Sequence, residues 1–172
     1  MELGLLVLRV VVGALFVGHG AQKLFGSFGG HGVSGTAGFF DQIGLRPARL
    51  HAVASGVAEV TGGLLLVLGL VTPLATVLLT AVMTAAILTV HLRNGLWVTA
   101  NGYEYNLVMI AAAFAVAAVG AGDWSLDNVL DLDVAGTGWA LGALGLGLLG
   151  GIGAVLSSRL QRAEHPKAQP TA

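Results

Sequence analysis

The chain has 172 residues, of which 55% are hydrophobic and only 10% are charged, with a formal net charge of −1. Soluble proteins average about 25% charged residues, so this composition excludes a water-soluble surface and indicates an integral membrane protein. The absence of cysteine excludes disulfides, cysteine zinc sites and iron–sulfur clusters held by this chain. No basic patch is present that would bind nucleic acid.

The first apolar run, residues 3–25, is long enough to cross a bilayer. It lacks the positive start and the cleavage site of a signal peptide, so we interpret it as a retained span. Charged side chains are costly inside a bilayer and therefore point toward other helices or toward a surface. On a helix, the polar and small residues of this run share one face at alternating steps of four and three: Arg9, Gly13, Phe16, Gly20 and Lys23.

The remaining apolar runs predict four more spans. Three of them, at about residues 51–70, 74–91 and 104–119, complete a four-span core, and the glycine-rich run at 134–156 predicts a fifth. The polar segment 157–172 is predicted to be a disordered cytoplasmic tail. We therefore expect an all-α helical bundle in the membrane, made of the four-span core and a C-terminal span.

The basic residues predict the orientation of this bundle. With five spans, the loops on one side and the tail carry lysine and arginine, while the opposite loops carry none. Cytoplasmic loops are enriched in these residues, so we expect a plasma-membrane protein with its N-terminus outside and its C-terminus in the cytoplasm. The residues on the basic side are Arg46, Arg49, Arg93, Arg159, Arg162 and Lys167.

Alternation of the spans brings most of the polar side chains toward one membrane face. Glu59 is the most informative, because an unpaired carboxylate at its depth would be protonated, whereas Lys23 or a histidine could keep it ionised. The alternative is an ion pair that only packs helices, and Arg9, in the opposite half, could be an interfacial anchor. The candidate catalytic residues are Glu59, His91 and Glu104, and the candidate ligand-binding residues are Arg9, His19, Gln22, Lys23 and Asn101.

Other kinds of site find little support in the sequence. The histidines and carboxylates show no metal-ligand spacing, so no metal site is expected. No flavin, nucleotide or phosphate-binding motif is present. A haem would require two histidines facing each other, such as His19 and His91, and the sequence leaves that possibility open.

The order and spacing of several short motifs resemble the DoxX family, over residues 1–127 as a four-helix membrane domain. The resemblance implies a small bacterial or archaeal membrane protein that belongs to an oxidoreductase system, in some relatives linked to quinones or to oxidative stress. It also implies that Arg9, Lys23, Glu59, His91 and Glu104 occupy the polar positions of the family. The motifs are Arg9-(x3)-Gly13-(x2)-Phe16-(x3)-Gly20-(x2)-Lys23-Leu24, Ala58-Glu59-(x2)-Gly62-Gly63, Leu68-Gly69-Leu70, His91, Asn101-Gly102-Tyr103-Glu104 and Gly120-x-Gly122-(x2)-Ser125-Leu126-Asp127.

These observations lead to one preferred function and two alternatives. The preferred one is a redox-linked membrane subunit whose polar end binds a quinone headgroup, with electrons supplied by a protein partner. The first alternative is a non-catalytic scaffold that docks partner enzymes, and the second is a small proton-coupled transporter. The sequence leaves open whether the chain is itself an enzyme, and whether it associates with membrane lipid alone, with a partner or with copies of itself. A cavity at the end that contains Lys23, Glu59, His91 and Glu104 would favour the quinone site.

Overall fold

The computed structural model describes residues 2–164, with side chains described as far as residue 160. Every regular element in this part of the chain is helical, which confirms the predicted all-α bundle. The helices are α1 Glu2–Phe25, α2 Gly32–Ile43, α3 Ala48–Leu68, α4 Thr72–Ala86, α5 Glu104–Val119, α6 Leu126–Val129 and α7 Thr137–Glu164. Short helical turns, Ile87–His91, Leu92–Asn94 and Val98–Ala100, lie between α4 and α5.

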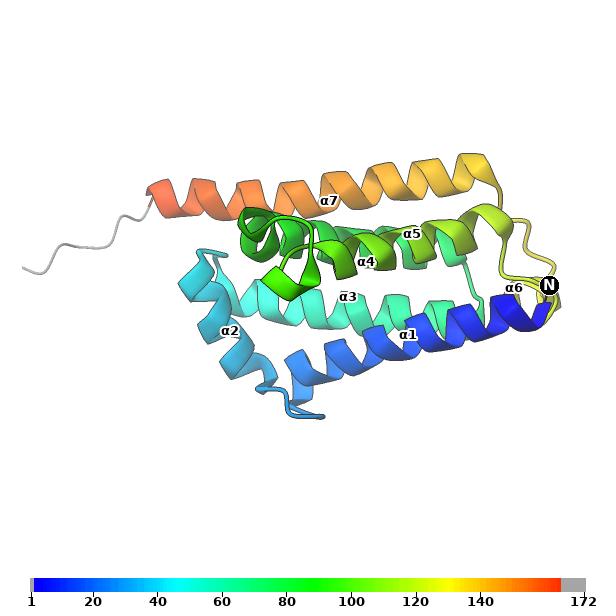
Figure 1. Ribbon diagram of the computed structural model, residues 1–172, viewed down its shortest axis with the longest axis horizontal. Coiled ribbons are helices and arrows are strands. Elements are labelled where there is room, and N and C mark those ends of the chain that lie inside the picture. Colours follow the sequence, from blue (N-terminus) through cyan, green and yellow to red (C-terminus); the bar gives the residue numbers. More distant parts are fainter. Residues whose placement is uncertain (1, 165–172) are drawn as a thin grey trace, which may run out of the picture.

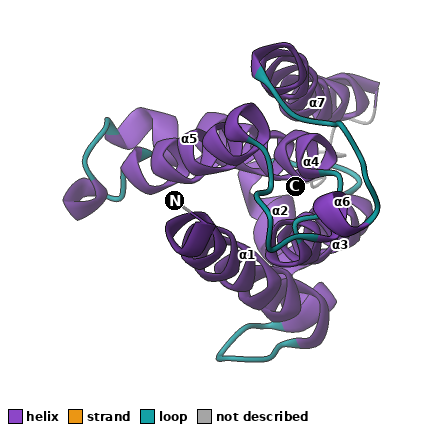
Figure 2. Ribbon diagram, turned by 90° about the vertical axis from the view of Figure 1, so that its right-hand side faces the viewer, coloured by secondary structure: helices purple, strands orange, loops and turns teal. Residues whose placement is uncertain are grey.

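The long helices run side by side along the long axis of the molecule, and α2 crosses their direction at one end (Figure 1). The N-terminus and α6 lie at the opposite end. Viewed along the axis, α4 lies among α3, α5 and α7 (Figure 2), and it packs against all three. Helix α1 packs mainly against α3, and α2 packs against α3 and α1. The bundle is therefore built around α3 and α4.

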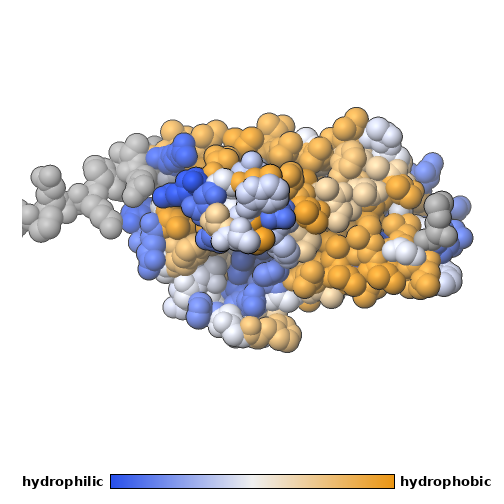
Figure 3. Space-filling view, in the orientation of Figure 1, coloured by the Kyte–Doolittle hydropathy of each residue, from blue (hydrophilic) through white to orange (hydrophobic). Residues whose placement is uncertain are grey.

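Within the described residues, four helical stretches are long and apolar enough to cross a membrane: Glu2–Phe25, Ala48–Leu68, Thr72–Asn94 and Thr137–Leu160. Helix α5 is also apolar but has only 16 residues, about 24 Å at 1.5 Å per residue. Hydrophobic side chains cover much of the visible surface of the molecule, between hydrophilic patches at the two ends of its long axis (Figure 3). The chain is a multi-pass membrane protein.

Glycines set the distance between α1 and α3. A Cβ added to Gly13 would lie 2.5 Å from the carbonyl oxygen of Gly63, and one added to Gly63 would lie 2.6 Å from that of Gly13. A second pair repeats this arrangement, since a Cβ on Gly20 would lie 2.7 Å from the carbonyl oxygen of Gly56. Small residues allow helix backbones to approach closely in lipid, where no hydrophobic force drives them together. The small-residue face of the first helix thus contacts α3.

Helices α4 and α7 approach each other in the same way. Cβ atoms added to Gly147 and Gly151 would lie 2.6 Å from the Cβ atoms of Thr80 and Thr84, respectively. Both threonines are buried, with exposed fractions of 0% and 6%. The C-terminal helix is therefore packed into the bundle through a glycine–threonine contact.

The C-terminal helix is longer than the predicted fifth span. Helix α7 continues to Glu164, so the part of the predicted disordered tail from 157 to 164 is helical. Ser158 packs at 1% exposure and donates a hydrogen bond to the Ala154 carbonyl oxygen at 3.0 Å, and this packing supports the extra turns. The rest of the predicted tail, 165–172, lies outside the described residues.

Candidate functional site

A buried ion pair joins the end of α1 to the middle of α3. Lys23 Nζ lies 2.5 Å from Glu59 Oε1, with the lysine side chain 24% exposed and the glutamate side chain 2% exposed. Gly20 and Gly56 lie three residues before Lys23 and Glu59, and they permit the close approach that brings the two charges together. The second carboxylate oxygen, Glu59 Oε2, has no hydrogen-bond partner among the described residues. Within the described part of the chain, only one of the two carboxylate oxygens of Glu59 is therefore hydrogen-bonded.

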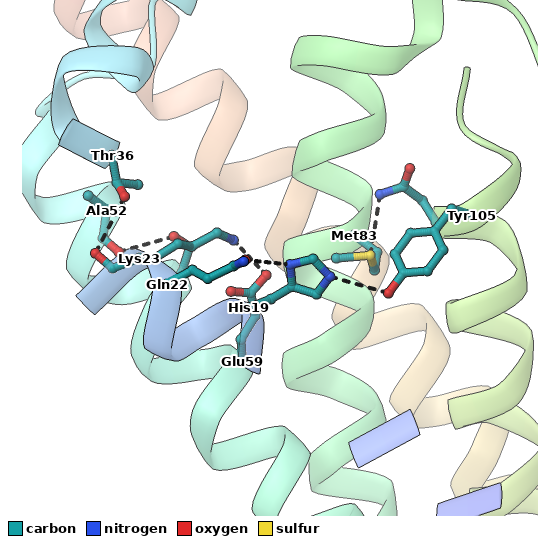
Figure 4. A network of polar contacts seen from close by, with 10 residues as sticks. His19, Gln22, Lys23, Thr36, Ala52, Glu59, Met83 and Tyr105 are labelled. Carbon is teal, nitrogen blue, oxygen red and sulfur yellow. Dashed lines mark hydrogen bonds and ion pairs between the residues drawn. The ribbon is translucent and has the colours of Figure 1, made fainter. Parts of the chain in front are cut away.

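Three further polar side chains lie beside this pair (Figure 4). His19 Nδ1 lies 3.2 Å from Gln22 Oε1, and His19 Nε2 lies 3.4 Å from the hydroxyl of Tyr105 on α5. The rings of His19 and Tyr105 meet edge to face with their centroids 6.2 Å apart. These contacts connect α1 to α5 next to the ion pair and form a polar cluster of Lys23, Glu59, His19, Gln22 and Tyr105.

Lys23 also lines a cavity of about 500 Å³, which the other four residues of the polar cluster do not line. Its walls come from α2, α3, the end of α4 and α7, and they are mostly apolar. Apolar cavities of this size with a few polar groups are typical of small-molecule sites. The polar residues in its wall are Lys23, His51, Ser55, Thr89 and His91.

The π-helical turn at the end of α4 contributes one wall of this cavity. Ile87–His91 forms this turn, and its residues Thr89, Val90 and His91 line the cavity. Single π-helical turns within α-helices are frequent at functional sites. His91 Nδ1 lies 2.8 Å from the backbone oxygen of Asn101, which ties the turn to the loop that follows.

Glu104 holds the same loop from its other side. Its Oε2 accepts a hydrogen bond of 2.9 Å from the backbone N–H of Val98. Asn94 Nδ2 donates to the Asn101 carbonyl oxygen at 3.1 Å. Glu104 and Asn101 are not among the residues that line the cavity. The structure therefore brings Lys23, Glu59, His19 and Gln22 together, places His91 on the cavity wall, and places Glu104 and Asn101 in the loop behind it.

Arg9 lies toward the opposite end of α1, roughly 21 Å from Lys23 along the helix axis. It is 1% exposed, and its guanidinium donates to the carbonyl oxygens of Ala121 and Trp124, the second at 2.6 Å. Asp127 ties the same loop to the α3–α4 turn by accepting from the Val71 N–H at 2.7 Å. The arginine therefore holds the loop after α5 in place.

Four polar residues of the site were not among the sequence candidates: Tyr105, and His51, Ser55 and Thr89 of the cavity wall. Tyr105 contacts His19, and His51 lines the cavity and lies 2.9 Å from Ser158 Oγ on α7. His51 and Ser55 are one helical turn apart, and this spacing could have indicated that both face the cavity. No group of three or more His, Cys, Asp or Glu side chains in the described part of the chain could hold a metal ion.

Comparison with known proteins shows the family of this chain. The DoxX family model matches residues 4–92. The chain is 32% identical to "Putative oxidoreductase CatD" of Bacillus subtilis over 73% of this chain and 86% of that protein. It is 30% identical to "Uncharacterized membrane protein Rv3486" of Mycobacterium tuberculosis over 72% of this chain and 78% of that protein. No solved structure matches the chain. The family model covers more than half of the chain and both relatives match most of it, so this protein belongs to the DoxX family.

Proposed function

We propose that this protein is a membrane subunit of a redox system and that it binds a quinone-type headgroup in the cavity beside Lys23. The observation that carries the proposal is the juxtaposition of a buried ion pair with an apolar cavity of about 500 Å³. The name of the Bacillus subtilis relative, an oxidoreductase, supports the redox assignment. A bacterial plasma membrane is the setting in which such a subunit would meet quinones.

The chemistry of the ion pair suits this role. An ammonium group carries three N–H donors, and Glu59 Oε1 is the one acceptor that the described residues give Lys23. The remaining donors are available to an oxygen of a ligand in the cavity. Glu59, with its free Oε2, and His19 do not line the cavity, but they lie beside Lys23, and both can accept and release protons, as oxidation or reduction of a quinone requires.

The cost of the arrangement also supports a functional role. Ionisable side chains within membrane helices are expensive and mark ligand sites and proton relays. Replacing a buried ion pair by apolar residues of similar volume often costs no stability, so helix packing alone does not require the charges. The chain contains no cysteine, so thiolate-bound redox centres would belong to a partner protein, and we propose that such a partner supplies the electrons.

The cavity supports this function over a scaffold. A protein that only docks other proteins requires a packed polar cluster without a ligand-sized space. The wall of the cavity instead includes five polar residues and is otherwise apolar, which fits an amphiphilic ligand. The scaffold remains an outcome of the experiment below.

We further propose that the cavity end faces the cytoplasm. Arg46, Arg93 and Arg159 lie in the segments at this end, whereas the loop after α5 contains Asp123 and Asp131 and no lysine or arginine. The bias of basic residues toward cytoplasmic loops supports this orientation.

Native mass spectrometry of the protein in mild detergent, with chromatography of the extracted lipids, tests the proposed function. We expect a quinone-class lipid bound to the wild type and lost in Lys23→Met and in Glu59→Leu. The matched control is Asp41→Asn, which removes one carboxylate from the exposed Asp41–Arg46 pair (2.8 Å) at the same end. Circular dichroism and a monodisperse elution profile would establish that each variant is folded. Phospholipid alone, with a co-purifying protein, would instead support the scaffold.

A further inference from the structure

The polar groups in the cavity wall can be sorted by the hydrogen-bond capacity that the protein leaves unused. His91 Nδ1 lies 2.8 Å from the Asn101 carbonyl oxygen. A carbonyl oxygen only accepts, so Nδ1 carries the proton and Nε2 of the neutral ring is left as an acceptor. His51 Nε2 lies 3.2 Å from the Arg46 carbonyl oxygen, so its proton is on Nε2 and is likewise used.

The two hydroxyl groups in the wall have also used their protons. Ser55 Oγ donates to the Ala52 carbonyl oxygen at 3.1 Å, and Thr89 Oγ1 donates to the Ala85 carbonyl oxygen at 2.7 Å. A hydroxyl has one proton and two lone pairs. Each of these groups therefore offers only lone pairs to a ligand.

Lys23 is the exception in this wall. Its ammonium has three N–H donors, one of which binds Glu59 Oε1. Among the described residues that line the cavity, Lys23 is the one whose side chain retains unused donors. The cavity thus combines a single donor group with a wall of acceptors.

From this accounting we infer that the cavity selects a ligand that brings hydroxyl donors, a hydroquinone, over the corresponding quinone. The inference rests on the proposed function and specifies its ligand. One hydroquinone oxygen accepts from Lys23, and a hydroxyl proton binds an acceptor such as His91 Nε2. A quinone has only acceptor oxygens, and an acceptor buried against another acceptor lacks the hydrogen bond that water would give it.

The test compares three short-chain ligands of the same size class on protein in nanodiscs: a quinone with one isoprenoid unit, its hydroquinone, and the dimethyl ether of that hydroquinone. Equilibrium dialysis under argon, in mildly alkaline buffer, would give the three affinities. We expect the hydroquinone to bind at least about tenfold more tightly than the quinone, a ratio that corresponds to about 1.4 kcal/mol. The dimethyl ether, which has no donor, should bind as weakly as the quinone.

Two variants test whether the side chains of the cavity wall cause the preference for hydroquinone over quinone. His91→Phe removes one acceptor and should reduce the hydroquinone-to-quinone affinity ratio several-fold. Arg93→Gln, at an exposed position two residues further on, should leave the ratio unchanged. Because the readout is a ratio measured on one variant, a general loss of folded protein lowers both affinities and leaves the ratio intact.

The outcomes separate the inference from the function on which it rests. Equal binding of quinone and hydroquinone, tighter binding of the quinone, or an unchanged ratio in His91→Phe would overturn the inference and leave a quinone site standing. Binding of none of the three ligands would overturn the proposed function and the inference together.

Discussion

Lys23 on α1 and Glu59 on α3 form an ion pair of 2.5 Å inside the bundle, and Glu59 Oε2 has no hydrogen-bond partner in the described part of the chain. The pair connects the two helices at the point where a polar cluster and an apolar cavity meet. One interaction therefore contributes to helix packing and supplies polar groups to the candidate site. The two contributions can be measured separately.

Breaking the pair on one side should destabilise the protein more than removing it entirely. Lys23→Met leaves the buried Glu59 without its partner, and we expect the free energy of unfolding to fall by about 3–5 kcal/mol. Glu59→Leu leaves only Lys23, whose side chain is 24% exposed, and should cost less. The double variant should lose markedly less than the sum of the two. Unfolding in mixed micelles, followed by circular dichroism, would give the three values. Additive losses would show that the two side chains do not interact.

The exposed pair at the same end provides the comparison. Arg46 Nη2 lies 2.8 Å from Asp41 Oδ1, and both side chains are partly exposed. Surface pairs contribute about 0–1 kcal/mol, so Arg46→Gln should change the unfolding free energy little. A loss as large as that of Lys23→Met would mean that any charge change at this end perturbs the fold.

The glycines between α1 and α3 should tolerate no side chain. In Gly63→Ala, the new methyl group would lie 2.6 Å from the Gly13 carbonyl oxygen. We expect a loss of about 1–3 kcal/mol from overpacking, measured by the same unfolding assay. Gly18→Ala, on the α1 helix that Gly63 contacts, places its methyl group where nothing lies within 4 Å and should be close to neutral. Equal effects of the two substitutions would contradict the observed helix contact.

Arg9 should not be replaceable by lysine. Its guanidinium donates to two carbonyl oxygens, of Ala121 and Trp124, and a single ammonium group does not reproduce that planar fork. We expect Arg9→Lys to increase amide hydrogen exchange across residues 120–130 while exchange near Lys23 remains unchanged. Arg93→Lys, at an exposed position, is the control. Unaltered exchange in the 120–130 loop would show that the arginine does not hold it.

The orientation can be tested with single cysteines, because the chain contains none of its own. Ser157 and Asp133 are both exposed and lie near opposite ends of α7. In intact cells, a membrane-impermeant maleimide should label Asp133→Cys and should label Ser157→Cys only after lysis. Labelling of both in intact cells would contradict a fifth span, and the reverse pattern would invert the proposed topology.

The sequence by itself determined the class of protein, the helical bundle and the family. Its low charge content and long apolar runs exclude a soluble fold, and the spacing of Arg9, Gly13, Phe16 and Gly20 predicted a buried face that the structure confirms. Local composition is sufficient for these features because hydropathy and helical period are properties of neighbouring residues.

The tertiary structure decided which polar groups meet. Lys23 and Glu59 are 36 positions apart, and only the glycine contact between α1 and α3 brings them to 2.5 Å. His91 and Glu104, predicted beside them, are tied instead to Asn101 and Val98, because a π-helical turn and the following loop redirect the chain after α4. His51 lies in the cavity wall and contacts Ser158 of α7, a residue about a hundred positions away in the chain. Such contacts depend on helix rotation and crossing distance, which interhelical packing sets and which a pattern within one helix does not contain.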